Sequence, residues 1–366
     1  MARGSLDHFN WPILLVTLAI MVIGLVSLYS ATYDEARAGL PPLFVSQAIY
    51  MGMGLVVMAV VCAVDYRIYE RLAYFVYGAN CLLLLLILGV ARVVAGSQRW
   101  FHLGPISLQP SETAKLALVL ALAKFYHHDS RPGGYSLPEL WRPALLLVIP
   151  AFLIFEQPDL GSALFQVFIF ASMSLFARVR WRSIALLVML SLVVGPLAYN
   201  YALDDYQRDR IHTFLQPERD PRGKGYQTIQ ARYAIGAGRL KGTGFLAGTQ
   251  THQGFIPEQQ TDFIFTVLAE EWGLAGSMTL LLLYFMLILL GLFVAAQAKE
   301  RFGVFLAVGV VTIFFLQVSI NLGGVLGLLP LTGITLPLMS YGGSSVLSLL
   351  IGVGLLLNIS MRRYMF

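Results

Sequence analysis

Asp262 is the residue of this 366-residue chain whose surroundings point most directly to chemistry. It follows Thr261, where a polar segment gives way to an apolar run that begins at Phe263. A carboxylate at a boundary between water and lipid is partly desolvated, which raises its pKa from about 3.9 towards the range of a general base. The alternative is structural, with Asp262 as the cap of the helix that follows.

Glu112 and Lys115 form a second candidate site, at the start of another apolar run. Residues three apart share a helix face and can pair. Ser111 as N-cap and Glu112 in the first turn would suit a helix start, but the charge of Lys115 opposes the helix dipole. Ionisable residues inside membrane segments are functional candidates by default. We interpret the pair as facing a substrate, with a purely structural ion pair as the alternative.

Three further polar candidates are Asp159, Arg210 and Lys241. Asp159 is either a substrate ligand or the N-cap of the next helix. Arg210 and Lys241 lie in a long polar segment, 202–262, and could bind an anionic substrate or meet lipid headgroups. Long loops in compact membrane proteins are more often functional than filler. The glycines of this segment form no phosphate-binding loop, which excludes ATP hydrolysis, and no two histidines have metal-ligand spacing.

The composition identifies the elements that must position these residues. Hydrophobic residues make up 57% of the chain and charged residues 12%, where soluble domains carry about a quarter charged. This excludes a soluble globular protein. About twenty apolar residues in a helix span a bilayer core of about 30 Å, so the sequence predicts a single all-α polytopic membrane domain over 1–366. We predict ten membrane helices, near 11–30, 44–64, 72–91, 111–126, 143–157, 160–178, 184–201, 263–297, 303–327 and 343–361.

The distribution of lysine and arginine predicts the orientation. With the N-terminus in the cytoplasm, the inner connections hold 13 basic residues and the short outer loops three. The net charge of +5 then reflects topology, since the basic residues form no stripe for nucleic acid. The first apolar run is longer than a signal-peptide core and is expected to be retained. Both termini are predicted to be cytoplasmic, and Asp262 to face an outward-opening polar cavity.

Several stretches, in order along most of the chain, resemble the SEDS family of bacterial cell-wall glycosyltransferases, and most closely its elongation-type members. The short polar stretch before Trp11 also resembles the elongation type. The matching stretches are Arg99-Trp100, Gln109-Pro110-Ser111-Glu112 with Lys115, Gln157-Pro158-Asp159-Leu160-Gly161, Tyr226-Gln227, Gly248-Thr249-Gln250, Pro257-Glu258, Thr261-Asp262-Phe263-Ile264-Phe265, Glu270-Glu271, and Leu329-Pro330-Leu331-Thr332-Gly333 through Ser340-Tyr341-Gly342-Gly343-Ser344-Ser345.

The resemblance implies that the protein polymerises lipid II, a disaccharide-peptide on undecaprenyl diphosphate, at the outer face of the bacterial cytoplasmic membrane. The family's invariant aspartate maps to Asp262 and its ion pair to Glu112 and Lys115. Expected partners are a class B penicillin-binding transpeptidase and other membrane proteins of the elongation complex. The chain departs from the family at Thr243, where many relatives have lysine, and at Gln260, where many have histidine.

One base is chemically sufficient for this reaction. A glycoside hydrolase needs two carboxylates because its alkoxide leaving group must be protonated. A diphosphate leaves unassisted once its charge is neutralised, so Asp262 could deprotonate the acceptor hydroxyl while cations stabilise the diphosphate, with inversion at the anomeric carbon. The candidate cations are Arg99, Lys115, Arg210, Lys241 or a bound divalent ion, Mg²⁺ or Mn²⁺.

Two other functions fit the sequence less well. A transporter that flips the lipid-linked precursor needs polar groups near the membrane midplane, whereas those found here gather at the outer end. A noncatalytic scaffold for a wall-synthesis partner would make Asp262 dispensable.

Overall fold

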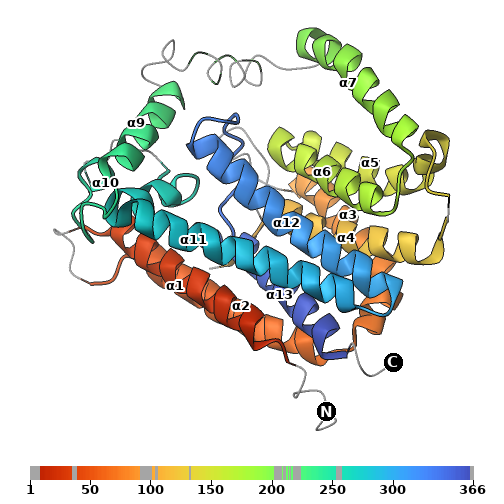
Figure 1. Ribbon diagram of the computed structural model, residues 1–366, viewed down its shortest axis with the longest axis horizontal. Coiled ribbons are helices and arrows are strands. Elements are labelled where there is room, and N and C mark those ends of the chain that lie inside the picture. The colour runs from red at the N-terminus through yellow and green to blue at the C-terminus, as the bar shows by residue number, and fades with distance from the viewer. Residues whose placement is uncertain are drawn as a thin grey trace.

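The structure, a computed structural model, describes residues 9–34, 39–90, 101–103, 106–131, 133–201, 208, 212, 214, 216, 224–252 and 258–362. Within these ranges the chain is a helical bundle with one small β-hairpin (Figure 1). The all-α polytopic prediction is confirmed.

Each of the ten predicted membrane helices is present. Eight helices in the described part of the chain have the length and composition of a membrane span. The other two are α4, which carries Glu112, Lys115 and Lys124, and α6, which has 17 residues. The ten are α1 (Trp11–Thr32), α2 (Pro42–Ala63), α3 (Tyr66–Val90), α4 (Pro110–His128), α5 (Trp141–Phe155, preceded by the 3-10 turn η2, Leu137–Leu140), α6 (Leu160–Phe176), α7 (Trp181–Tyr201), α11 (Ile264–Gln297), α12 (Arg301–Val325) and α13 (Gly343–Arg362).

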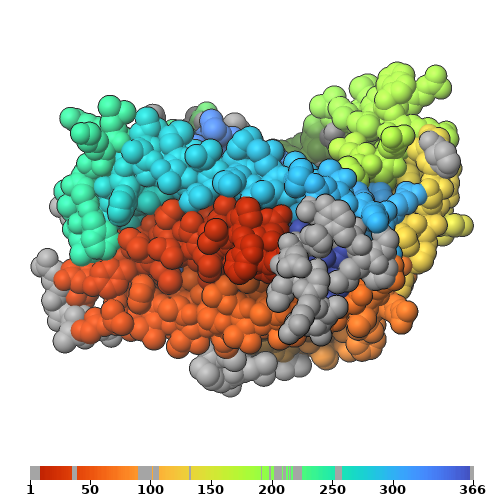
Figure 2. Space-filling view, turned by 60° about the horizontal axis from the view of Figure 1, so that its bottom comes forward, coloured from red at the N-terminus to blue at the C-terminus, as the bar shows by residue number. Residues whose placement is uncertain are grey.

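Burial separates the central helices from the peripheral ones. Of the most apolar 18-residue window, 89% is buried in α13 and 67% in α12, but only 6% in α7. Accordingly, α12 crosses the middle of the bundle in Figure 1, while α7 projects from it in both views (Figures 1 and 2). Figure 2 also shows α1 lying between α2 and α11 on one face. The central helices are therefore the frame on which a site can be held rigidly.

Successive membrane helices run in opposite directions, so every second helix begins at the same end of the bundle. At one end, which we call the Asp262 end, the start of α4 contacts the start of α13 and the start of α6 contacts Thr332. At the opposite end, the Arg301 end, Tyr126 near the end of α4 bonds Ser174 near the end of α6. The sequence candidates for chemistry that the structure describes lie towards the Asp262 end.

Four small elements at the Asp262 end were not predicted. Strands β1 (Phe101–Leu103) and β2 (Ile106–Leu108) pair antiparallel, with Phe101 opposite Leu108. The long polar segment contains α9 (Lys224–Ala237) and the short α10 (Thr249–His252).

The prediction of one continuous helix over 263–297 is wrong. Gly273 has φ +63° and ψ −157°, a conformation essentially restricted to glycine, and it divides α11 into a short helix, Ile264–Trp272, and a membrane-length helix. A break leaves backbone groups without helical partners. Here the turn 238–244 supplies them: Leu274 N–H donates to the Arg239 carbonyl at 2.8 Å, and Thr243 N–H donates to the Glu270 carbonyl at 2.9 Å.

Candidate active site

Asp262 lies in a turn immediately before the short helix of α11, and its side chain is partly exposed. Its backbone is held at both ends. Its N–H donates to the Glu258 carbonyl at 3.2 Å, and its carbonyl accepts from the Asn321 amide of α12 at 3.1 Å. The N-cap of α11 is Phe263, so the alternative of Asp262 as helix cap is wrong. The fold therefore fixes Asp262 without using it to begin the helix.

Gly333 lies next to the Asp262 carboxylate. Gly333 has φ +75°, and a Cβ built on it would lie 3.8 Å from Asp262 Oδ2. The same Asn321 amide that holds Asp262 also donates to the Ile334 carbonyl at 2.9 Å, so loop and turn are tied together. Thr332 in this loop contacts the start of α6 closely enough that its carbonyl would meet a Cβ on Gly161 at 2.8 Å. The loop that contains Gly333 is therefore fixed directly beside the carboxylate.

The stretch that leads into α13 connects this loop to three other elements. Gln47 of α2 donates to the Ser340 carbonyl at 2.9 Å and accepts from the Gly342 N–H at 3.2 Å. Ser344 accepts from the Gln109 N–H at 2.9 Å, at the start of α4. These bonds hold the two candidate sites, Asp262 and the Glu112–Lys115 pair, in one framework.

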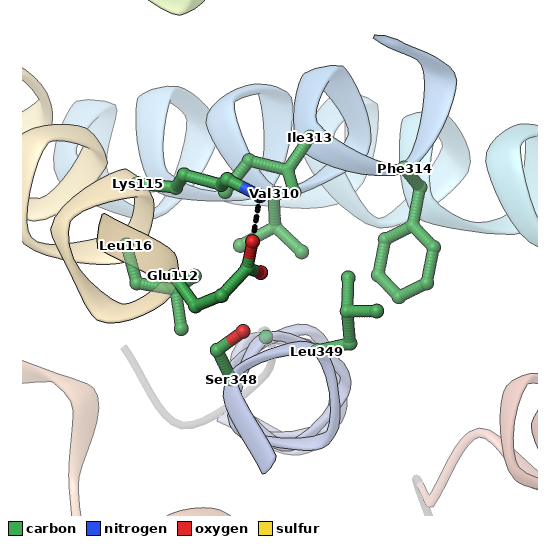
Figure 3. Close-up of a pocket in the computed structure, with 9 residues that line it drawn as sticks. Glu112, Lys115, Leu116, Val310, Ile313, Phe314, Ser348 and Leu349 are labelled. Atoms are coloured by element: carbon green, nitrogen blue, oxygen red, sulfur yellow. Dashed lines mark hydrogen bonds and ion pairs between the residues drawn. The ribbon is translucent and has the colours of Figure 1, made fainter. Parts of the chain in front are cut away.

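Glu112 and Lys115 form the predicted ion pair, with Lys115 Nζ 2.7 Å from Glu112 Oε1. Both are buried, and the ammonium also lies 4.7 Å from the centre of the Phe165 ring. The pair borders a narrow cavity of about 10 Å³ between α4, α12 and α13, as Figure 3 shows. The cavity is otherwise lined by Leu116, Val310, Ile313, Phe314, Ser348, Leu349 and Gly352.

Several buried polar atoms near the starts of α4 and α6 and along α12 have no hydrogen-bond partner within the described residues. They include Glu112 Oε2, Ser111 Oγ and both amide atoms of Gln166 and Gln317. Buried polar atoms of this kind bind water or a ligand. The prediction of Ser111 as N-cap is wrong, because Gln109 occupies that position and the Ser111 hydroxyl points into the interior.

The structure separates the remaining predicted site residues. Asp159 is the N-cap of α6, where Oδ1 accepts from the Ser162 N–H at 3.2 Å, as the structural alternative proposed. Lys241 is exposed and borders an apolar groove between α1 and α11 that has a volume of about 540 Å³ and includes Trp272. Arg99 and Arg210 lie outside the described residues. The geometry thus brings Asp262 and the ion pair into one framework, and places Lys241 in a different environment.

Glu270 and Glu271, to which the sequence assigned no role, connect the short helix of α11 to the preceding polar segment. Glu270 is fully buried and accepts from the N–H groups of Gln250 at 2.8 Å and Thr251 at 3.1 Å. Glu271 accepts from the Leu246 N–H at 3.1 Å and from the Ser30 hydroxyl. Two adjacent acids inside an apolar run were the available signal, but their donors are backbone groups that no motif reveals.

Thr243 and Gln260, the two residues at which the chain departs from many family members, form local hydrogen bonds. Thr243 donates from its hydroxyl to the Glu270 carbonyl at 3.1 Å. Gln260 accepts from the Tyr341 N–H at 2.9 Å through its backbone carbonyl, and its amide donates to Glu258 at 3.4 Å. Thr243 therefore stabilises the turn 238–244 against the short helix of α11, and Gln260 stabilises the turn that contains Asp262.

The donor set at Asp262 does not fit a metal held by protein ligands alone. Within the described ranges, one group of three histidine or acidic side chains could share an ion, Glu70 with His127 and His128, and it lies at the Arg301 end. Mg²⁺ is often held by one or two carboxylates together with substrate phosphates. Asp262 therefore fits a divalent ion only when a diphosphate supplies the other ligands.

Comparison with known proteins agrees with this arrangement. Residues 10–365 match the family of cell-cycle proteins that comprises FtsW, RodA and SpoVE. The chain is 38% identical over 358 residues to the peptidoglycan glycosyltransferase MrdB of Escherichia coli K12. This alignment covers 98% of this chain and 95% of MrdB.

Two solved structures have the same fold. The first is a chain of a peptidoglycan synthase complex, with a TM-score of 0.83, 35% identity, and coverage of 98% of this chain and 99% of that one. The second is the rod shape determining protein RodA of Thermus thermophilus, with a TM-score of 0.71, 32% identity, and coverage of 97% and 98%. Because the family matches nearly the whole chain and these relatives align over nearly its full length, the chain belongs to the FtsW/RodA/SpoVE family. The resemblance found in the sequence is confirmed.

Proposed function

We propose that this protein is a peptidoglycan glycosyltransferase of the elongation type that polymerises lipid II into glycan strands, with Asp262 as general base. The activity is that of its relative MrdB, and the match to a chain of a peptidoglycan synthase complex supports it. The observation that carries the role of Asp262 is local. Asp262 is partly exposed, its backbone is fixed from both sides, and the loop that contains Gly333 lies beside its carboxylate.

In the proposed step, Asp262 accepts the proton of the acceptor sugar hydroxyl. The hydroxyl oxygen forms the new bond to the anomeric carbon of the donor, and the bond from that carbon to the diphosphate breaks with inversion. The departing undecaprenyl diphosphate keeps the bonding electrons, so it needs positive charge and no general acid. Lys115 is one proposed cation for the diphosphate, and Arg99, Arg210 and Lys241 are the other candidates. A divalent ion, when bound, would neutralise the same charge.

Purified protein and purified lipid II test this proposal. We expect Asp262→Ala to abolish glycan formation, because general base catalysis contributes roughly 100- to 10,000-fold. Glu156→Gln is a matched control, since Glu156 is an exposed carboxylate at the same end of the bundle. Full activity of Asp262→Ala would remove Asp262 from the mechanism.

Reconstitution in liposomes separates the enzyme from a flippase of the lipid-linked precursor. Glycan product without lipid translocation supports the enzyme, and translocation without product supports the flippase. A scaffold would show neither activity.

The proposal includes an orientation and a partner. We place the Asp262 end outside the cytoplasmic membrane and both termini inside, in agreement with the excess of basic residues in the other set of connections. A class B penicillin-binding transpeptidase is the proposed partner, together with other membrane proteins of the elongation complex. Labelling of single cysteines at the two ends with a membrane-impermeant reagent tests the orientation, and copurification tests the partner.

A further inference from the structure

A basic pocket lies at the Arg301 end, on the side of the bundle opposite Asp262. It has a volume of about 340 Å³ and lies between the connection that follows α4, the end of α6 and the start of α12. Each of these three segments contributes one arginine: Arg131, Arg178 and Arg301. None of the described residues that line it is acidic. The rest of its wall is Ser130, Phe176, Ala177, Val304 and Phe305.

Two of the three arginines retain their positive charge uncompensated. Arg131 is neutralised, since it pairs with Asp129 at 3.1 Å and with Glu139 at 2.5 Å. In the described part of the chain, no carboxylate lies within ion-pairing distance of Arg178 or Arg301. The Arg301 guanidinium instead lies 5.9 Å from the centre of the Phe305 ring. The three arginines and the two carboxylates paired with Arg131 together leave one net positive charge, beside an aromatic wall.

The backbone at Arg178 is held in an unfavourable conformation. Its φ is +68°, a backbone angle that residues other than glycine rarely adopt. The Arg178 carbonyl accepts from the Tyr135 N–H at 2.9 Å, and the Arg180 N–H donates to the Tyr135 carbonyl at 2.9 Å. Gly134 allows this approach, because a Cβ there would overlap the Arg178 carbonyl oxygen. Strain of this kind persists where surrounding contacts impose it and is commonest at functional sites.

Membrane topology alone does not explain this pocket. The preference for basic residues at one membrane face accounts for their number, and it is met equally by Arg182 and Arg142, which do not line the pocket. That preference does not require three separate segments to bring arginines to one cavity, with no acidic residue among its described lining residues.

We propose that the pocket binds the phosphate headgroup of an anionic phospholipid. Arg178 and Arg301 contact the phosphate, and the first part of an acyl chain lies against Phe176, a residue that is 48% exposed. The depth fits a headgroup, since α6 ends at Phe176 and α12 begins at Arg301, the level where membrane helices leave the hydrocarbon core. Basic pockets between membrane helices at this level are known to bind lipid phosphates.

Lipid retention by the purified full-length chain tests the proposal. The protein is placed in nanodiscs of phosphatidylcholine with or without cardiolipin, and bound lipid is measured by native mass spectrometry. Arg178→Gln with Arg301→Gln should lower cardiolipin retention by about 25-fold, since each surface cation contributes about fivefold. Arg142→Gln with Arg182→Gln changes the net charge equally and should leave retention within about twofold of the unaltered chain.

Each other outcome overturns the proposal. Equal losses in the two double variants would show that cardiolipin binds the charged membrane face as a whole. Retention of phosphatidylcholine at the same level as cardiolipin would exclude recognition of the anionic headgroup. Protection of the protein against thermal unfolding by inorganic phosphate alone, reversed in the pocket variant, would assign the pocket to a soluble anion instead of a lipid.

Discussion

Asp262, Glu270 and Glu271 lie within ten residues of one another, yet they differ in burial and in the groups that bond them. Glu270 is fully buried and bonded to two backbone N–H groups of α10. Asp262 is partly exposed, and the described bonds that fix it are made by its backbone. The acids on the short helix hold the polar segment in place, whereas the acid before the helix is the proposed general base.

This difference shows how the burial of a carboxylate and the groups that bond it separate structural from chemical roles. A buried carboxylate that accepts several backbone N–H bonds is stabilised in its charged form and is a poor base. A partly exposed one on a rigid backbone can accept a proton during reaction. Glu112 is a third type, buried and paired with a side-chain cation.

The largest expected effect is the separation of activity from stability at Asp262. Asp262→Asn should lower the rate of lipid II polymerisation by about 100- to 10,000-fold, because the amide cannot accept the proton. The thermal midpoint should stay unchanged, since the backbone bonds remain. A drop in midpoint that parallels the loss of activity would make Asp262 a structural residue like Glu270.

The next largest effect concerns the buried pair. Lys115→Met should destabilise the protein by about 3–5 kcal/mol, because it leaves the Glu112 carboxylate buried and unpaired. Adding Glu112→Gln should restore most of that stability. If the pair faces a substrate, the double variant should nevertheless remain inactive in glycan synthesis. A double variant that is both stable and active would show that the pair has only a structural role.

A smaller effect is expected at Glu270. Glu270→Gln places an amide against the N–H groups of Gln250 and Thr251 and should cost about 1.5–3 kcal/mol, the value of a charge-assisted hydrogen bond. Hydrogen exchange should rise in residues 244–252 and remain unchanged in α12. Unaltered exchange in 244–252 would show that other contacts hold this segment.

The smallest effect is expected at the helix break. Gly273→Ala should destabilise the protein by about 1–3 kcal/mol, because alanine is strained at this φ and its Cβ would lie 2.4 Å from the Gly242 N. Gly195→Ala in α7 is the control, since a Cβ there meets no atom within 4 Å. An equal change in thermal midpoint for both variants would show that the break does not depend on glycine.

Much of the architecture was predictable, because each membrane helix is a local property of about twenty apolar residues. The Glu112–Lys115 pair was predictable for the same reason, since both partners lie on one helix turn. The break at Gly273 was not, because a glycine inside a long apolar run is compatible with a continuous helix. Its stability depends on carbonyl and N–H groups from 238–244, about thirty residues earlier in the chain.

The sequence by itself determined that the chain crosses a membrane many times, to which family it belongs, and which acids are candidates for catalysis. Hydropathy, basic residues and motifs are encoded along the chain and need no long-range contact. Only the tertiary structure decided that Gly333 lies beside Asp262, that Glu270 bonds α10, that Lys241 borders an apolar groove, and that three arginines meet in one pocket. Each of these depends on segments far apart in sequence, which packing of the central helices brings together.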